Sequence, residues 1–191
     1  AAGFIGSHLC EALLARGDSV VGVDNFNNFY SPALKEENLT TSAAHPDFCL
    51  IRGSLRDAAV RQQAFARPEP FDSVVHLAAW AGVRPSIEDP ALYQRENIEA
   101  TVALLETMRA NRQADHAQKL VLASSSSVYG NNKKIPFSED DNVDFPISPY
   151  AATKKSCELL AHTYHHLFGM DVTCLRFFTV YGPRQRPDLA I

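Results

Sequence analysis

The sequence has no long hydrophobic run, no basic tract and no close pair of cysteines. No apolar stretch approaches the roughly 18 residues that a membrane-spanning helix needs, and we find no signal-peptide pattern in it. Among 191 residues, 21% are charged and the formal net charge is −4, without a cluster of Lys and Arg. We therefore expect no membrane segment in this chain, no nucleic-acid partner and a cytoplasmic location.

Cysteine and histidine give no sign of a metal site. The chain has four cysteines, which are far apart in the sequence: Cys10, Cys49, Cys157 and Cys174. Three of them fall inside apolar helix or strand patterns, so we interpret them as free thiols in a reducing compartment rather than as disulfides or zinc ligands. Three histidines with helical spacing, at positions 162, 165 and 166, could bind a metal. They lack an evident acidic or cysteine partner, so a solvated helix face is the preferred interpretation.

Short apolar or β-branched runs alternate along the chain with longer helical patterns. The predicted strands are residues 19–24, 48–52, 71–79, 119–123 and 170–177, and the predicted helices are residues 7–16, 57–66, 90–112 and 150–168. The polar segment 25–46 is predicted to be irregular. Such alternation predicts an α/β fold with a doubly wound, parallel, Rossmann-like sheet and right-handed crossovers. Ligands of such a sheet bind at the carboxyl ends of its strands.

A glycine turn opens the first predicted helix. Gly3 and Gly6 would let backbone N–H groups approach a phosphate, whose charge the helix dipole favours. Asp24 ends the next predicted strand 21 positions after Gly3, close to the spacing of about 20 at which an acid accepts from an adenosine ribose hydroxyl. Asn25 and Asn28 follow it within reach of an adenosine. The alternative interpretation is a tight turn followed by a capping Asp.

A tyrosine and a lysine are spaced one helical turn apart after a serine cluster. Ser124–Ser127 follow an apolar strand, and Ser148-Pro149 opens the helix that carries Tyr150 and Lys154. A free phenol, with a pKa of about 10, is a poor base at neutral pH. A fixed ammonium nearby favours the phenolate, and a hydroxyl at the strand end can share a substrate proton. The alternative is a half-exposed Tyr and Lys on a surface helix.

With these residues placed, the chain resembles the extended short-chain dehydrogenases/reductases, in particular the NAD-dependent nucleotide-sugar epimerases and dehydratases. The resemblance is strongest to UDP-glucuronate 4-epimerases. It is carried by residues 2–8, 23–25, 76–84, 124–130, 150–154 and 176–183. Two positions depart from the family pattern. The first glycine of the family's motif would precede Ala1, and Ser54 stands where the family usually has an Asp near the adenine.

The resemblance implies roles for individual residues. Tyr150, Lys154, Ser125 and Ser126 would be catalytic. The residues expected to bind NAD are Gly3, Phe4, Ile5, Gly6, Asp24, Asn25, Asn28, Leu77, Ala78, Ala79, Asn97, Tyr150, Lys154 and Phe177. Those expected to bind a UDP-sugar are Arg84, Ser125, Ser126, Ser127, Thr179 and Arg186. The two arginines could grip a uronate carboxylate bidentately, or they could form surface or dimer ion pairs.

The resemblance also implies a reaction. The expected activity is epimerisation at C4 of a UDP-sugar through a 4-keto intermediate, with UDP-glucuronate giving UDP-galacturonate. Related decarboxylases and dehydratases carry acids where this chain has Ser126 and Ser127, which favours epimerisation. A UDP-glucose/galactose 4-epimerase and a UDP-glucuronate decarboxylase remain alternatives, and so does a non-catalytic NAD-binding module on the same fold.

The expected domain is a single dinucleotide-binding domain over residues 1–191. Because the sequence opens on Ala1 without a preceding strand and stops after a strand and turn, we interpret it as a fragment truncated at both ends. It would lack the first strand and most of a C-terminal substrate domain, into which residues 179–191 would lead. We expect this fragment alone to be inactive, and the whole protein to be a homodimer formed through the helices at 90–112 and 150–168.

Overall fold

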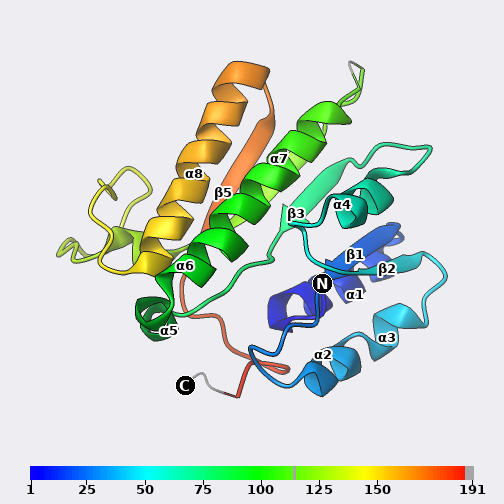
Figure 1. The fold of residues 1–191 in the computed structure, drawn as a ribbon, viewed down its shortest axis with the longest axis horizontal. Helices are drawn as coiled ribbons and strands as arrows, with labels where there is room; N and C mark the ends of the chain where they lie inside the picture. The colour runs from blue at the N-terminus through cyan, green and yellow to red at the C-terminus, as the bar shows by residue number, and fades with distance from the viewer. Residues whose placement is uncertain (114, 188–191) are drawn as a thin grey trace. The chain divides into compact units, whose positions relative to one another are not determined.

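The computed structural model describes residues 1–113 and 115–187 (Figure 1). The chain divides into two compact units. One comprises Ala1–Arg67 together with the segment that begins at Thr179, and the other is Pro68–Phe178. Residues 188–191, the end of the segment expected to lead into a substrate domain, lie outside the described residues.

The first unit contains a two-stranded parallel sheet. Its elements are α1 (Phe4–Arg16), β1 (Val20–Asp24), α2 (Pro32–Asn38), α3 (Thr40–Ala43), β2 (Phe48–Arg52) and α4 (Ala58–Phe65). The pairing runs from Val20 opposite Phe48 to Asp24 opposite Arg52. Ile51, Val60 and Ala64 form a buried cluster between β2 and α4. The carboxyl end of β1 therefore places Asp24 at the edge of this sheet.

The helices of this unit differ from the prediction in two places. α1 begins three residues early, at Phe4, because Gly3 serves as its N-cap in an extended conformation and accepts a hydrogen bond from Ser7 N–H at 2.9 Å. The segment predicted to be irregular contains α2 and α3. The available signal was Ser31-Pro32, a cap residue followed by proline at the first helical position.

The second unit contains a three-stranded parallel sheet in the order β3-β4-β5. Its strands are β3 (Ser73–His76), β4 (Lys119–Ser125) and β5 (Asp171–Phe177), and its helical elements are α5 (Val83–Glu88), α6 (Pro90–Tyr93), the π-helix η1 (Gln94–Glu99), α7 (Ala100–Ala110), the 3-10 helix η2 (Ser126–Tyr129) and α8 (Pro149–Phe168). Figure 1 shows α7 and α8 side by side along this sheet. The predicted parallel pairing is confirmed throughout, although the described strands form two sheets rather than one continuous ladder.

The helix predicted for residues 90–112 is divided into three parts. Its middle turn is π-helical around Asn97, whose carbonyl accepts from Thr101 Oγ1 at 2.6 Å and from Cys157 Sγ at 3.5 Å. Insertion of side-chain donors into a helical ladder is a recognised cause of such irregularity. All four cysteines are free thiols; Cys10 and Cys157 are buried, whereas Cys174 is half-buried and Cys49 is exposed on β2.

Candidate functional site

The serine cluster forms a tight turn at the carboxyl end of β4. The side chains of Leu120 and Leu122 are buried and fix this strand in the core. Ser125 ends the strand in an extended conformation and is the N-cap of η2. Ser125 Oγ accepts from Ser127 N–H at 3.2 Å and from Ser127 Oγ–H at 2.9 Å. Ser125 thus accepts two hydrogen bonds and retains its own O–H proton for donation. Ser126, the first residue of η2, is half-buried beside it.

The N-terminus of α8 fixes Tyr150 and Lys154. Ser148 caps the helix by accepting from Ala151 N–H at 3.1 Å, and Pro149 starts it. Lys154, only 6% exposed, donates through Nζ to the carbonyl oxygen of Ala123 on β4 at 2.8 Å. Its Nζ lies 6.0 Å from the centroid of the Tyr150 ring. Burial lowers the pKa of Lys154 below its ordinary value. The lysine is therefore no solvated surface side chain.

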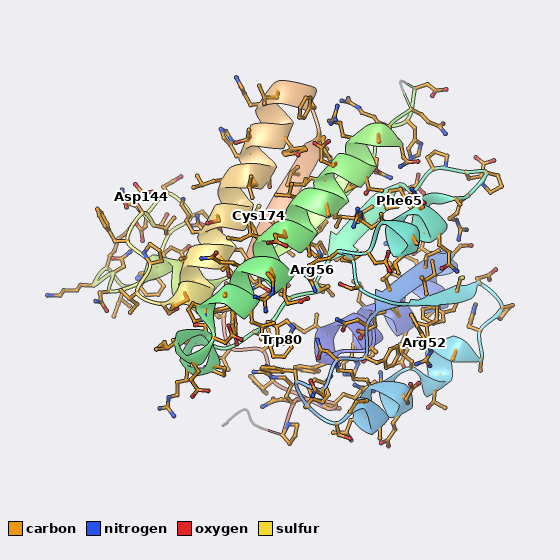
Figure 2. The ribbon with its side chains drawn as sticks, in the orientation of Figure 1. Arg52, Arg56, Phe65, Trp80, Asp144 and Cys174 are labelled. Atoms are coloured by element: carbon orange, nitrogen blue, oxygen red, sulfur yellow. The ribbon has the colours of Figure 1, made fainter. Side chains whose placement is uncertain are left out.

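An aromatic wall supports the ring of Tyr150. The ring of Tyr93 meets it edge-on, with centroids 6.2 Å apart and planes at 81°. Tyr93 is itself buried, donates through its hydroxyl to the Ala81 carbonyl at 2.9 Å, and contacts Trp80 edge-on. Edge-to-face packing restricts the ring orientation of Tyr150. Trp80, labelled in Figure 2, is thereby a packing residue of this wall.

Asn97 connects the loop after β3 to α8. Its amide accepts from Trp80 N–H at 2.8 Å, donates to the Trp80 carbonyl at 3.0 Å, and donates to Thr153 Oγ1 at 3.0 Å. The side chain is almost completely buried. The resemblance implied that Asn97 stabilises the loop in which Ala78 and Ala79 would pass the cofactor, and these bonds to Trp80 hold that loop, where Ala78 is exposed.

A partly buried ion pair behind the serine turn was not predicted. Arg176 on β5 donates from Nε and Nη2 to the two carboxylate oxygens of Glu158, both at 3.0 Å. Ser124 Oγ donates to the same carboxylate at 2.5 Å. Hydrogen bonding to Glu158 raises the pKa of Arg176, despite the opposing effect of burial. The signal in the sequence was position: Glu158 follows Lys154 by one helical turn and so shares its sheet-facing side.

In the other unit, the glycine turn and the acid at the end of β1 lie together, as their spacing predicted. Asp24 accepts from Ala2 N–H at 2.9 Å through Oδ2 and from Phe26 N–H at 2.8 Å through Oδ1. A Cβ on Gly6 would lie 2.8 Å from the Ala1 carbonyl oxygen, so only glycine fits there. Gly3 is the N-cap of α1, and Phe4 to Gly6 belong to its first turn.

The loop after β1 brings a tyrosine to this turn, and α2 brings a lysine to that loop. Lys35 is 5% exposed, donates through Nζ to the backbone and side-chain oxygens of Asn27, both at 2.8 Å, and lies 5.0 Å from the Tyr30 ring centroid. The Tyr30 hydroxyl is buried without a hydrogen-bond partner, and a Cβ on Gly3 would be 4.0 Å from it. An orphaned hydroxyl beside a helix N-terminus fits a phosphate group such as that of NAD. Asn25 and Asn28 are exposed.

The remaining predicted residues are spread over the two units. Phe177 pairs with Ser125 across β4 and β5, while Arg84 is exposed on α5. Thr179 is exposed, and Arg186 lies with its guanidinium 4.8 Å from the Phe29 ring centroid in the first unit. The structure therefore gives Arg186 a stacking partner that the sequence did not suggest.

Two further findings concern metals and membranes. In the part of the chain that the structure describes, no group of three or more His, Cys, Asp or Glu side chains is arranged to hold a metal ion. His165, one of the three spaced histidines, bonds through Nδ1 to the Met170 carbonyl at 2.7 Å. None of the helices within residues 1–113 and 115–187 combines the length and the apolar character needed to cross a membrane.

Comparison with known proteins gives consistent matches over the whole chain. UDP-glucuronate 4-epimerase 3 of Arabidopsis thaliana is 50% identical over 190 residues, which are 100% of this chain and 43% of that protein. The crystal structure of UDP-glucuronic acid 4-epimerase from Bacillus cereus, in complex with UDP-glucuronic acid and NAD, matches with a TM-score of 0.89 and 42% identity, covering 100% of this chain and 58% of that one. UDP-glucose 4-epimerase from Thermotoga maritima, with UDP-glucose, matches with a TM-score of 0.83 and 33% identity, covering 98% and 56%.

The chain spans about half the length of the relatives it matches. The sequence profile described as GDP-mannose 4,6 dehydratase matches residues 1–191. With the parallel α/β fold, the glycine turn and the Ser, Tyr and Lys side chains in place, the chain belongs to this family of extended short-chain dehydrogenases/reductases, which includes the nucleotide-sugar epimerases.

Proposed function

We propose that the whole protein is an enzyme that epimerises C4 of a UDP-sugar with NAD as cofactor, and that it converts UDP-glucuronate to UDP-galacturonate. The observation that carries this proposal is the buried amine of Lys154. It is held by the Ala123 carbonyl at 2.8 Å and lies 6.0 Å from the Tyr150 ring, where β4 ends in Ser125. A non-catalytic binding module would have no need to bury an amine beside a phenol.

In this mechanism the chain positions the sugar and moves its proton. Tyr150 takes the proton of the sugar 4-OH and returns it after the 4-keto sugar has turned over. Lys154 holds the phenolate form by its charge, and Ser125 donates a hydrogen bond to the reacting oxygen. We also assign Ser126, the next residue of the serine turn, to the catalytic residues. NAD, when bound, supplies the acceptor and donor of the hydride. Positioning accounts for much of the rate in such a site.

We assign NAD to two sets of residues. Gly3–Gly6 and Asp24 would bind the pyrophosphate and the adenosine ribose, with Asn25 and Asn28 beside the adenosine. The residues of the second unit that would line the cofactor are Leu77, Ala78, Ala79, Asn97, Tyr150, Lys154 and Phe177. In support, Asp24 is hydrogen-bonded to the glycine turn, and the buried Tyr30 hydroxyl beside Gly3 lacks a partner.

The choice of uronate rests on the serine turn and on two arginines. Ser126 and Ser127 stand where a decarboxylase or dehydratase would carry an acid, which an epimerase does not need. Thr179, Arg84 and Arg186 would complete its binding, since a guanidinium grips a carboxylate bidentately. UDP-glucose is the second candidate, because a protein crystallised with UDP-glucose is among the structural matches.

The same proposal extends to the domains, the location and the oligomeric state of the protein. We infer a single dinucleotide-binding domain over residues 1–191, followed by a substrate domain, and a cytoplasmic homodimer without a nucleic-acid partner. The dimer would form through the helices at 90–112 and 150–168, where Leu159 and Leu167 on α8 are 54% and 62% exposed. Four free cysteines fit a reducing compartment.

The test is turnover by the purified whole protein. UDP-glucuronate and UDP-glucose would each be incubated with it, and the products separated by chromatography and identified by NMR. We expect UDP-galacturonate from the first. Tyr150→Phe and Lys154→Met should each lower kcat by about a thousandfold. Lys155→Met, one residue along the same helix and ion-paired with Asp144 at 3.9 Å, is the matched control and should remain active.

Three other outcomes would identify the alternatives. Release of CO2 would show a decarboxylase, and epimerisation of UDP-glucose alone would show the second candidate. Bound NAD without turnover of any UDP-sugar would favour the binding module. Wild-type activity in Tyr150→Phe would refute the assigned mechanism.

A further inference from the structure

The segment that carries two of the proposed substrate residues is docked on the helix proposed for NAD. We name residues 179–187 the strap; Thr179 and Arg186 belong to it. The strap and α1 lie in the same compact unit, although about 160 residues or more separate them in the sequence. The inference that follows rests on the proposed function, because it takes these two residues to contact the sugar.

Three successive strap residues contact one side of α1. A Cβ on Gly182, whose φ is +149°, would be 3.7 Å from the Phe4 ring. The Pro183 carbonyl bonds to His8 Nε2 at 3.0 Å. Arg184 reaches Glu11, one turn further along the helix, at 2.7 Å between Nη2 and Oε1. The contacts thus follow the helix from its first residue to its third turn.

Arg184 is the strongest of these attachments. Besides Glu11, it contacts Ser7 Oγ at 3.4 Å, and both members of the ion pair are only 26% exposed. The hydrogen bond from Arg184 is the main cause that lowers the pKa of Glu11. Arg184 also has a φ of +66°, a left-handed conformation that residues other than glycine adopt only where the surroundings enforce it. Arg184 thus combines this ion pair with a backbone conformation that is uncommon for its residue type, in a turn closed by a hydrogen bond from Gln185 N–H to the Gly182 carbonyl at 3.2 Å.

The strap also contacts the second element proposed for NAD. The guanidinium of Arg186 lies 4.8 Å from the ring centroid of Phe29, in the loop that follows Asp24. Phe29 N–H in turn donates to Asn27 Oδ1 at 3.2 Å, and Asn27 is held by Lys35. One ordered segment is therefore shared between the glycine helix, the loop after β1 and the substrate residues.

We propose that Arg184 is a positioning residue that, through Glu11, holds the strap on α1 and so keeps Thr179 and Arg186 in place for the UDP-sugar. The physical basis is preorganisation: a strap that is already fixed on the helix loses little conformational entropy when the sugar nucleotide binds, whereas a strap released from α1 must be ordered at that moment.

The experiment uses variants of the whole protein that remove the ion pair without disturbing the backbone. Arg184→Asn retains a residue that tolerates positive φ, and Glu11→Gln removes the charge but not the shape. Asp18→Asn is the matched control, since it breaks the exposed pair between Asp18 and Arg16 at the end of the same helix. Calorimetric titration of the NAD-loaded proteins with UDP-glucuronate and with UDP-glucose measures binding, and thermal melting checks folding.

We expect Arg184→Asn and Glu11→Gln each to raise the Kd of the bound UDP-sugar about tenfold, with kcat unchanged within about twofold. The double variant should be no worse than either single one, because both remove the same contact. Arg184→Lys should recover part of the affinity, since a lysine restores the charge but not the fork.

Two results would overturn the inference. Affinities equal to those of Asp18→Asn would show that the ion pair has no such role, and additive losses in the double variant would show that the two side chains act separately. If the variants lost NAD affinity and melting temperature together, and Arg184→Lys recovered neither, the contact would be merely structural. If wild-type protein binds neither UDP-sugar, the proposed function itself fails, and that is seen before any variant is measured.

Discussion

β4 and β1 each end, at the carboxyl end of their sheet, in a group of polar side chains, but the two groups are built differently. At β4, side chains are held by fixed partners: Lys154 is bound to the Ala123 carbonyl, and Glu158 accepts hydrogen bonds from Ser124 and Arg176. At β1, Asp24 is held mainly by backbone N–H groups, and the hydroxyl of Tyr30 is buried without a partner.

This difference corresponds to the chemistry proposed for the two regions. Groups that move a proton must be positioned before the substrate arrives, since a buried polar network orients them only if it is satisfied. Groups that bind a phosphate can present free donors that the ligand itself completes. The first region is therefore organised by side chains, and the second by the backbone of a glycine turn.

Removal of Glu158 is the strongest test of the first region. Glu158→Leu would leave the partly buried Arg176 charge without its carboxylate partner, although its bonds to the Tyr129 hydroxyl and the Glu139 carbonyl remain, and we expect the free energy of unfolding to fall by roughly 3 kcal/mol. Denaturant titration measures it. Glu36→Leu, which breaks the exposed and equally two-pronged ion pair between Glu36 and Arg52 at 2.6 and 2.7 Å, is the control and should cost less than about 1 kcal/mol. Equal losses in the two variants would show that the network is not a special feature of this region.

The pH dependence of the free energy of unfolding tests the burial of His76, which lies on β3 beside β4. His76 is buried with Nε2 3.1 Å from Thr101 Oγ1, and burial, followed by the charge of Lys154, lowers its pKa to about 3. The unfolded chain binds a proton near pH 6.5, where the folded protein does not, so protonation favours unfolding. Stability should fall by roughly 1.4 kcal/mol per pH unit from this site as the pH drops below 6.5 towards 3.

His76→Gln isolates this contribution, because every other titrating group is common to the two proteins. The difference in unfolding free energy between wild type and variant should depend on pH over that range and be constant above pH 7. Parallel curves between pH 7 and pH 4 would contradict the burial of a neutral imidazole.

The smallest expected effect concerns the second region. Tyr30→Phe removes only the hydroxyl beside Gly3, and we expect NAD to bind about tenfold more weakly, as for the loss of one hydrogen bond to a charged phosphate. Stability without NAD should not fall, since the buried hydroxyl has no partner to lose. Titration with NAD measures the first effect and thermal melting the second. An unchanged NAD affinity would remove Tyr30 from the binding site.

Much of the fold follows from local sequence signals. The run that ends in Asp24, the cap Ser148-Pro149 and the glycine after α1 each mark an element that the structure contains. The juxtaposition of Asp24 with the glycine turn was also predictable, because parallel strands and the helices between them have a fixed hand. The π-helical turn at Asn97 was not, since it depends on donors from Thr101 and from Cys157 on another helix.

The sequence by itself determined the alternation of strands and helices, the spacing of Tyr150 and Lys154, and the glycine turn, because these depend on periodicity, caps and neighbours along the chain. Only the tertiary structure decided what those side chains meet: the Ala123 carbonyl for Lys154, Glu158 for Arg176, and Glu11 for Arg184. Each of these contacts joins residues 18 to 173 positions apart, and such pairings are fixed by packing and burial rather than by local propensity.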